Sequence, residues 1–276
     1  MPRVDPPTNL KALNQRITNL SATELERTRK VQIMANIVLS QMMPEGAIKG
    51  GSAMKIRMGD SATRFSKDFD VSKKEDLESF IDKLEENLVT GWSDFSGTLI
   101  TDKQASPKGV NPAYVIHPFR VLLRYRGSIW ASVPLEVGHD EMGDTLTPEH
   151  EISQDLVELF TAVGLEAPVP VPLLAVKYQI AQKLHASSAI NSQRAHDLVD
   201  LQLLIKTKPI DLVELRGICI KLFKYRKEHR WPPVVAINKD WETLYGEAAD
   251  NVEVLEDVTA AVAWVNELIK RIESSS

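Results

Sequence analysis

Apolar residues recur at helical spacing in two stretches of the first third of the chain. The pattern predicts one helix over 21–41, opened by a Ser-Ala-Thr-Glu capping box, and another over 72–89, opened by Ser-Lys-Lys-Glu. Pro44 ends the first helix and Gly91 ends the second. Between the two helices, 47–49 is predicted as a short strand.

Alternation of apolar and polar residues replaces the helical pattern in the next segment. It predicts strands over 97–101, 113–125 and 128–137, with Arg126-Gly127 as a tight hairpin turn. Proline cannot donate to a neighbouring strand, so Pro134 places the last of these strands at a sheet edge.

The remainder of the chain has helical periodicity, interrupted by the stiff, extended connector 167–172. Six helices are predicted there, over 149–163, 173–190, 194–206, 211–228, 240–249 and 255–272. The fold class is therefore mixed α/β (α+β): a sheet domain with helices over 1–148, and a helical domain over 149–276.

Composition restricts the class of protein. The chain has 276 residues, enough for a sizeable core, and contains no apolar run near the ~20 residues needed to cross a bilayer. Its first residues lack the apolar centre of a signal peptide, so we expect a cytoplasmic protein without a membrane partner. Cys219 is the one cysteine and is expected to be a small core residue.

Basic residues gather in two places, although the net charge is −5. Residues 221–230 carry five Lys or Arg and one Glu, beside the aromatic side chains of Phe223 and Tyr225. Arg120, Arg124 and Arg126 share one strand parity. Such groups bind phosphates and stack on bases, or are simply solvated faces, and the sequence does not choose between the two.

Candidate chemistry begins at the turn Lys49-Gly50-Gly51-Ser52. Glycines let backbone N–H groups approach an anion closely, and Ser52 is expected to open a short helix whose N-terminus attracts phosphate. The turn is not a Walker loop, because it contains no Gly-Lys-Ser/Thr.

Two carboxylates follow on one strand. Asp68 and Asp70 share the parity of Ser66, so all three are expected to point to one face, with Arg64 just before them. Carboxylates near a phosphate-binding turn are suited to a divalent metal that bridges nucleotide phosphates. The alternative is an edge strand with a solvated acidic face.

These residues resemble a known family. Lys49-Gly50-Gly51-Ser52-Ala53 followed by 64–70, Arg-Phe-Ser-Lys-Asp-Phe-Asp, is similar to the first signature of the AbiEii/MenT-type nucleotidyltransferase toxins, of the DNA polymerase β-like superfamily. The resemblance implies a third carboxylate on the neighbouring strand. Glu136 is the candidate, where most of the superfamily have Asp; the alternative is a solvent-facing residue.

A second constellation lies on two of the predicted helices. Lys183 and Asp197 lean toward apolar stripes, and either pair with each other as a structural salt bridge or act in catalysis. Lys177 flanks the same stripe, so periodicity alone does not choose between the lysines. The segments Ile180-Ala-Gln-Lys183-Leu-His-Ala186 and Arg194-Ala-His-Asp197-Leu-Val-Asp200 resemble later family signatures, which implies that Lys183 contacts the triphosphate and Asp197 completes the site. Asp200 is expected to order the helices.

The resemblance implies a reaction. Asp68, Asp70 and Glu136 would bind Mg²⁺ or Mn²⁺, and Lys49, Gly50, Gly51, Ser52, Arg64, Ser66 and Lys183 would bind the NTP. Nucleotides would be added to the 3′ end of tRNA to block translation, and a cognate antitoxin would be a partner. Phosphorylation of Ser66 is a candidate route of inactivation, since it would add negative charge beside the metal.

Three other hypotheses remain. One is the transfer of nucleotides to a protein side chain instead of RNA, and another is a non-catalytic binding member of the fold. A phosphohydrolase of the His-Asp type is the third, prompted by His139-Asp140 and His196-Asp197. Its further ligands are not evident among six scattered histidines.

Overall fold

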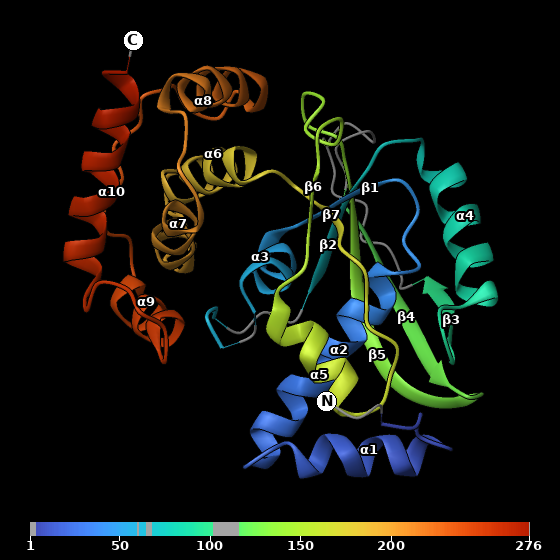
Figure 1. Ribbon diagram of the computed structural model, residues 1–276. Helices are drawn as coiled ribbons and strands as arrows, with labels where there is room; N and C mark the ends of the chain where they lie inside the picture. Colours follow the sequence, from blue (N-terminus) through green and yellow to red (C-terminus); the bar gives the residue numbers. More distant parts are fainter. Residues whose placement is uncertain (1–3, 60, 65–67, 102–115, 276) are drawn as a thin grey trace. The chain divides into compact units, whose positions relative to one another are not determined.

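The structure is a computed structural model, and it describes residues 4–59, 61–64, 68–101 and 116–275 (Figure 1). The chain divides into two compact units. Unit 1 comprises Met1–Asp60, Ser66–Asp140 and Thr145–Leu173, and unit 2 comprises Ser61–Phe65, Glu141–Asp144 and Leu174–Ser276. The main division thus follows Leu173, whereas the sequence pattern placed it after residue 148. A nucleotidyltransferase domain over 1–148 and a helical domain over 149–276 that completes the active site stay predictions.

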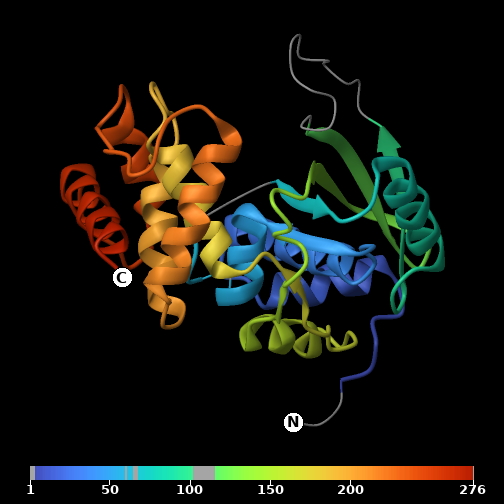
Figure 2. The same ribbon diagram turned by 90° about the horizontal axis from the view of Figure 1, so that it is seen from above.

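A seven-stranded mixed sheet forms the centre of unit 1 (Figures 1 and 2). Its strand order is β3-β4-β5-β2-β1-β7-β6. Neighbours are antiparallel except β2 with β5 and β1 with β7, which are parallel. The strands are β1 (Gly46–Lys49), β2 (Phe69–Lys73), β3 (Phe95–Thr101), β4 (His117–Tyr125), β5 (Ser128–His139), β6 (Glu149–Glu151) and β7 (Val171–Leu173).

The predicted hairpin between β4 and β5 is confirmed. Arg126 and Gly127 join the two strands with φ values of 47° and 81°, the left-handed backbone of the turns that match strand twist. Along β4, Phe119 and Val121 are buried while Arg120 between them is exposed. The alternation read from the sequence therefore places one face of the sheet in the core.

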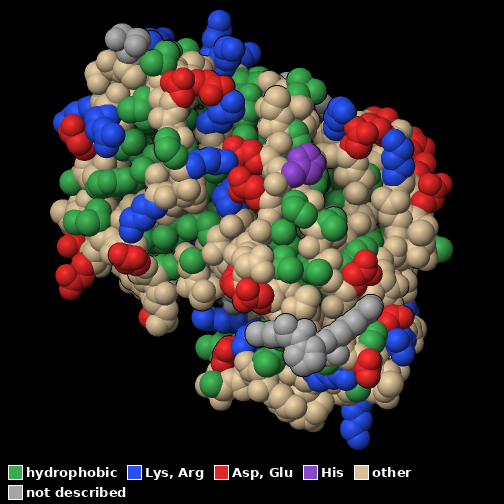
Figure 3. Space-filling view, viewed as in Figure 1, with side chains coloured by type: hydrophobic (Ala, Val, Ile, Leu, Met, Phe, Trp, Pro, Cys, Tyr) green, Lys and Arg blue, Asp and Glu red, His purple; other side chains and the backbone are tan. Residues whose placement is uncertain are grey.

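Five helices belong to unit 1: α1 (Leu10–Asn19), α2 (Glu24–Ser40), α3 (Gly50–Met58), α4 (Leu77–Thr90) and α5 (Gln154–Ala162). The apolar side of α4 supplies Phe80, Leu84 and Leu88 to the core. Its outer side carries acidic residues and Lys83, which gather as mixed charge over α4 in Figure 3. The amphipathic pattern predicted both faces of this helix.

Both predicted capping boxes were wrong in position. The N-cap of α2 is Thr23, whose side chain accepts from the N–H of Glu26, and the N-cap of α4 is Asp76. Ser72 cannot cap α4 because it still belongs to β2, where it is paired with β1 on one side and with β5 on the other. Pairing in the sheet therefore extends past the expected helix start.

Pro134 does not mark an edge strand. β5 lies inside the sheet, between β4 and β2. Its register with β2 begins at Leu135, one residue after the proline. The missing N–H is therefore tolerated where β5 has not yet started to pair on that side.

The predicted helix over 149–163 and the connector before residue 173 were also wrong in part. Glu149–Glu151 is strand β6, and Val171–Leu173 is strand β7, which pairs with both β6 and β1. These two short strands continue the sheet of unit 1, which is why the unit extends to Leu173.

Unit 2 contains five helices that agree with the prediction to within a few residues at each end. They are α6 (Val176–Ser187), α7 (His196–Thr207), α8 (Leu212–Arg226), α9 (Trp241–Ala249) and α10 (Val258–Glu273). α6 packs against both α7 and α8. Cys219 on α8 is fully buried, and burial raises its pKa to about 12, as expected of a core thiol. None of the described helices combines the length and the apolar character that a membrane span requires.

Candidate active site

Two of the predicted carboxylates lie directly beside each other in unit 1. Asp70 on β2 is the register partner of Glu136 on β5, and adjacent strands lie ~4.8 Å apart. Both side chains are half-buried, on the face opposite the core residues Phe69 and Leu135. The sequence expectation that Glu136 lies on the strand beside Asp70 is confirmed, whereas a role in metal binding is not tested by the register.

The environment of Glu136 raises its pKa. Burial is the largest cause, followed by the negative charges of Asp70 and Asp68. Asp68 is exposed and directly precedes β2. Three carboxylates thus act on one another here, and the crowding of like charge favours any cation that enters.

Lys49 extends this row across a third strand. It is the register partner of Asp70 on the β1 side, so Lys49, Asp70 and Glu136 follow one another across β1, β2 and β5. The positive charge of Lys49 opposes the rise in the pKa of Glu136, but it is a smaller influence than burial. The ammonium reaches toward β5, where a Cβ on Gly138 would lie 2.8 Å from the Lys49 Nζ.

Gly50 permits the close approach of Asp70. Its φ is +63°, and a Cβ at this position would lie 2.1 Å from Asp70 Oδ2. Helix α3 begins at Gly50 rather than at Ser52, and Lys49 before it makes no side-chain cap. The first backbone N–H groups of α3 therefore start beside the carboxylate of Asp70, at the helix end that favours anions.

The Ser52 hydroxyl makes a structural contact inside unit 1, and a contact of Ser52 with the nucleotide stays a prediction. The side chain is fully buried and donates to the backbone carbonyl of Asp68 at 2.8 Å. Asn36 on α2 donates to the same hydroxyl at 3.4 Å. These contacts position the backbone at Asp68. Sequence reasoning missed Asn36, although a polar residue among the buried positions of helix α2 was a usable signal.

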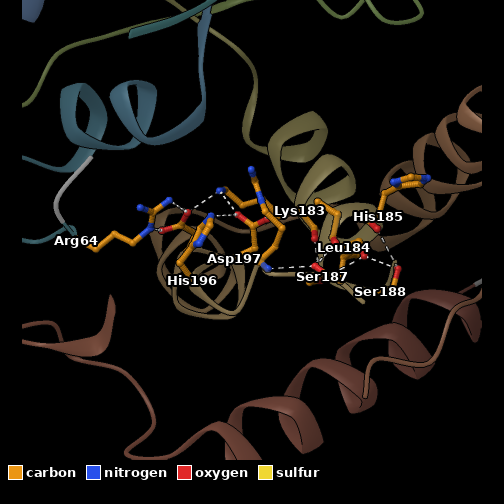
Figure 4. A network of polar contacts seen from close by, with 12 residues as sticks. Arg64, Lys183, Leu184, His185, Ser187, Ser188, His196 and Asp197 are labelled. Carbon is orange, nitrogen blue, oxygen red and sulfur yellow. Dashed lines mark hydrogen bonds and ion pairs between the residues drawn. The ribbon is translucent and has the colours of Figure 1, made fainter. Parts of the chain in front are cut away.

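A buried ion network in unit 2 contains the second predicted constellation (Figure 4). The Lys183 ammonium donates to Asp197 Oδ1 at 2.9 Å and to Asp200 Oδ2 at 2.5 Å. Lys183 is 6% exposed and both carboxylates are buried. The structural salt bridge that the sequence left open is therefore present, between α6 and α7.

Arginines complete the network. Arg64 forms two bonds of 2.9 Å to the two oxygens of Asp200, and Arg194 donates to Asp197 Oδ2 at 3.0 Å. Burial alone would raise the pKa of both aspartates. The positive charges of Lys183 and the arginines outweigh this effect, so both carboxyl pKa values lie below the ordinary range. Asp200 thus links α7 to α6 and to Arg64, which agrees with the prediction that it orders the helices.

His196 stands at the edge of this network and is neutral at physiological pH. Burial is the main cause that lowers its pKa to about 4. Lys177, the lysine that periodicity could not separate from Lys183, pairs instead with Glu214 on α8, and both side chains are partly exposed. The two lysines therefore differ in burial, and Lys183 is the anomalous one.

The basic segment 221–230 only partly matches its prediction. Lys221 and Lys224 are exposed on α8, as a phosphate-binding face requires. Phe223 is 2% exposed and packs against His185, His229 and Trp231, so it does not offer a ring for base stacking. The prediction of stacking on Phe223 was wrong, because the residue lies on the core side of the helix.

Sequence reasoning also missed Glu141. Arg226 donates to both of its carboxylate oxygens, at 3.0 and 2.7 Å, and Gln182 donates to one of them at 3.0 Å. Glu141 follows β5 in a segment without periodicity, so no signal in the sequence indicated this role.

A group of potential metal ligands lies outside the carboxylate row. The ligand atoms of His185, Glu228 and His229 lie within 4.8 Å of one another. His185 Nε2 is buried without a hydrogen-bond partner among the described residues. Arg226 lies 3.3 Å from the other ring nitrogen, and burial together with that charge lowers the His185 pKa to about 4. The fixed charge of Arg226 opposes a divalent cation here, and two imidazoles are not the oxygen ligands that Mg²⁺ prefers.

The two constellations belong to different compact units, since the carboxylate row is in unit 1 and the Lys183 network is in unit 2. That both serve one reaction stays a prediction. Ser66 lies outside the described residues, so its nucleotide contact and its phosphorylation stay predictions.

A mixed sheet that aligns carboxylates on neighbouring strands, beside a helix opened by glycine, is the arrangement expected of a nucleotidyltransferase. The family model for the nucleotidyl transferase AbiEii toxin of type IV toxin–antitoxin systems matches residues 32–266. The chain therefore belongs to this family of nucleotidyltransferase toxins.

One solved structure agrees in fold. MenT4, a nucleotidyltransferase toxin from Mycobacterium tuberculosis H37Rv, matches with a TM-score of 0.53 and 17% identity, over 96% of this chain and 97% of that one. JHP933 from Helicobacter pylori matches with a TM-score of 0.45 and 13% identity, over 91% and 93%. No curated protein matches the chain. Family membership overrides the phosphohydrolase hypothesis, and the His185 group contains neither of the His-Asp pairs that prompted it.

Proposed function

We propose that this toxin transfers nucleotides from an NTP to an RNA acceptor, the 3′ end of tRNA, in a reaction that requires Mg²⁺ or Mn²⁺. The observation that carries the proposal is the register of Asp70 with Glu136, directly beside the glycine-opened start of α3. This arrangement places acidic oxygens and an anion-binding helix end together within unit 1. The tRNA acceptor rests on family resemblance.

The carboxylate row fits a hard divalent cation. Its donors are carboxylate oxygens, the ligands that Mg²⁺ and Mn²⁺ prefer. Burial raises the pKa of Glu136, the charges of Asp70 and Asp68 add to the rise, and Lys49 opposes it. We assign Asp68, Asp70 and Glu136 as the ligands. When bound, the metal supplies charge neutralisation for the phosphates and for the attacking oxygen.

The reaction balances without any further reactant. The acceptor hydroxyl oxygen forms a bond to the α-phosphorus, the bond from that phosphorus to the β-bridging oxygen breaks, and pyrophosphate leaves with the electron pair. Asp70 or Glu136 accepts the hydroxyl proton. The first N–H groups of α3, at Gly50 and Gly51, and the ammonium of Lys49 bind the phosphates of the NTP.

Further phosphate contacts come from residues outside the carboxylate row. Lys183 would neutralise the leaving pyrophosphate, Asp197 would hold that lysine in place, and Arg64 and Ser66 would complete the nucleotide site. The ammonium of Lys183 already has two carboxylate partners, so contact with a triphosphate requires an exchange of partners. The backbone near Ser52, rather than its hydroxyl, serves the nucleotide, since the hydroxyl is bonded to Asp68.

Nucleotides added to the 3′ end of tRNA would prevent its aminoacylation and so stop translation. A cognate antitoxin would restrain this activity, as expected for a toxin of this family. The exposed lysines Lys221 and Lys224 would contact the body of the RNA by charge alone.

The test is incubation with Mg²⁺, radiolabelled NTPs and total RNA. We expect label in RNA of tRNA size, lost in Asp70→Asn and retained in Asp82→Asn, a matched change at an exposed position of α4. Mapping of the labelled end identifies the acceptor. Label on protein would indicate a protein acceptor instead of RNA. Absence of any label with every NTP would indicate a non-catalytic member of the fold.

A further inference from the structure

The sheet face that carries Asp70 and Glu136 continues into a basic surface. In the register of β4 with β5, Pro118 lies opposite Glu136 and Arg120 lies opposite Pro134, two residues before Glu136. Residues two apart on a strand share a face, so Arg120 is a diagonal neighbour of Glu136, ~7–8 Å away between Cα atoms. A long arginine side chain spans that distance.

The same face extends further along β4. Arg124 is four residues beyond Arg120, ~13 Å along the strand. The register of β4 with β5 shifts between Leu123 and Arg124, and the extra residue lies in β5. Arg124 therefore keeps the parity of Arg120 on β4. Thr98 and Ser132, which flank Leu122 between the two arginines, are exposed. The alternate residues of β4 are in the core.

We infer that this surface, defined by Arg120, Leu122 and Arg124, binds the single-stranded 3′ end of the RNA acceptor and leads it to the carboxylates. The inference rests on the proposed function. The charge of this surface indicates the kind of ligand it binds. Two arginines beside an acidic metal site attract a polyanion, and arginine binds phosphate oxygens through paired N–H groups. The small and apolar side chains between them leave room for sugars and bases.

The position of this surface distinguishes it from the basic segment 221–230. Arg120 and Arg124 lie in the same sheet and at a fixed register from the proposed metal ligands, so an RNA strand bound to them is aligned with the reacting hydroxyl. Arg120 and Arg124 are therefore positioning residues for the acceptor. They select for a nucleic-acid backbone, not for a base sequence.

The test compares Arg120→Gln/Arg124→Gln with wild type and with Lys83→Gln/Lys270→Gln, which removes the same charge from exposed helix positions. RNA and NTP are varied separately. We expect the arginine variant to raise KM for RNA roughly two- to thirtyfold, the range of two exposed ion pairs, with KM for NTP unchanged. The control variant should leave both values unchanged.

Salt gives a second readout. Two phosphate contacts to a single strand contribute a slope of about −1.4 to the dependence of log affinity on log salt, or about sevenfold between 50 and 200 mM. The arginine variant should lose that part of the salt dependence. Fluorescence anisotropy with a labelled twelve-nucleotide RNA measures it without any transfer, so it tests the surface even when transfer itself is not seen.

Three outcomes overturn the inference. Unchanged RNA affinity and salt slope in a variant that melts like wild type would show that the face does not bind RNA. A raised KM for NTP alone would assign the arginines to the triphosphate. Loss of antitoxin neutralisation with unchanged RNA kinetics would make the face a protein-binding surface. Failure of wild type to label RNA, with normal anisotropy, would refute the proposed reaction but not the RNA surface.

Discussion

Substitution of Lys183 by methionine separates the two roles considered for this residue. Five charges are grouped in its network: Lys183, Arg64 and Arg194 are positive, and Asp197 and Asp200 are negative. The group therefore has one net positive charge. Methionine retains most of the volume of the side chain but removes a cation that contacts both buried carboxylates.

The expected loss of stability follows from burial. Asp197 and Asp200 are 0% and 1% exposed, and removal of one partner from a buried ion pair costs ~3–5 kcal/mol. Arg64 and Arg194 still donate to the two carboxylates, so we expect the lower end of that range, about 3 kcal/mol. Loss of a surface ion pair costs at most about 1 kcal/mol.

Equilibrium unfolding in urea, followed by circular dichroism, measures this loss. The matched control is Lys177→Met on the same helix, since Lys177 makes a partly exposed pair with Glu214. We expect the midpoint of Lys177→Met to stay close to wild type and that of Lys183→Met to fall well below it. Equal free energies of unfolding for the two variants would refute the buried network as the dominant environment of Lys183.

A double variant then tests catalysis without the stability defect. Lys183→Met/Asp197→Asn removes one charge of each sign and leaves the Arg64–Asp200 pair, so part of the lost free energy of unfolding should return. We expect this folded variant to remain inactive in RNA labelling, because the proposed phosphate contact is missing. Recovery of activity together with stability would show that Lys183 is structural only.

Two further predictions concern Gly50 and pH. Gly50→Ala should abolish transfer, because its Cβ would lie 2.1 Å from Asp70 Oδ2. The control Gly127→Ala, also at positive φ but with no atom within 4 Å of the added Cβ, should retain transfer and lose only ~1–3 kcal/mol of stability. Inactivity of both variants would point to a general folding defect. The stability of unit 2 should be greatest above pH 6.5 and fall as the pH drops toward 4, because the pKa values of His185 and His196 are lowered to about 4 and the unfolded chain takes up those protons first. Urea unfolding at pH 7 and pH 4.5 measures the fall, which His196→Gln should reduce; an identical slope in that variant would contradict the assignment.

Local periodicity was sufficient for most of the fold. The helical spacing of apolar residues located α2, α4 and the helices of unit 2, and strand parity placed Asp70 on the face opposite Phe69. Parity also placed Glu136 opposite Leu135, and the register of β2 with β5 then brings the two carboxylates together. Sequence predicts such a pair when both strands alternate regularly, since only the strand order remains to be inferred.

Features that depend on long-range pairing were beyond the sequence. Glu149–Glu151 looks like the start of a helix because acidic residues favour first turns, yet it pairs with β7. The contacts of the buried Ser52 hydroxyl with Asp68 and Asn36 were likewise not predicted. In both cases the deciding partner is distant in sequence, so neither propensity nor spacing contains the information.

The two carboxylate groups of this protein differ in how their charge is compensated, and that difference bears on where a metal binds. In unit 2, positive charges lower the pKa of Asp197 and Asp200 in spite of complete burial, so these carboxylates already have their cations. In unit 1, burial and neighbouring carboxylates raise the pKa of Glu136 in spite of Lys49. A divalent ion gains most where carboxylates crowd one another and the donors are oxygens. This contrast supports the row of Asp70 and Glu136, rather than the Lys183 network, as the site to which Mg²⁺ binds.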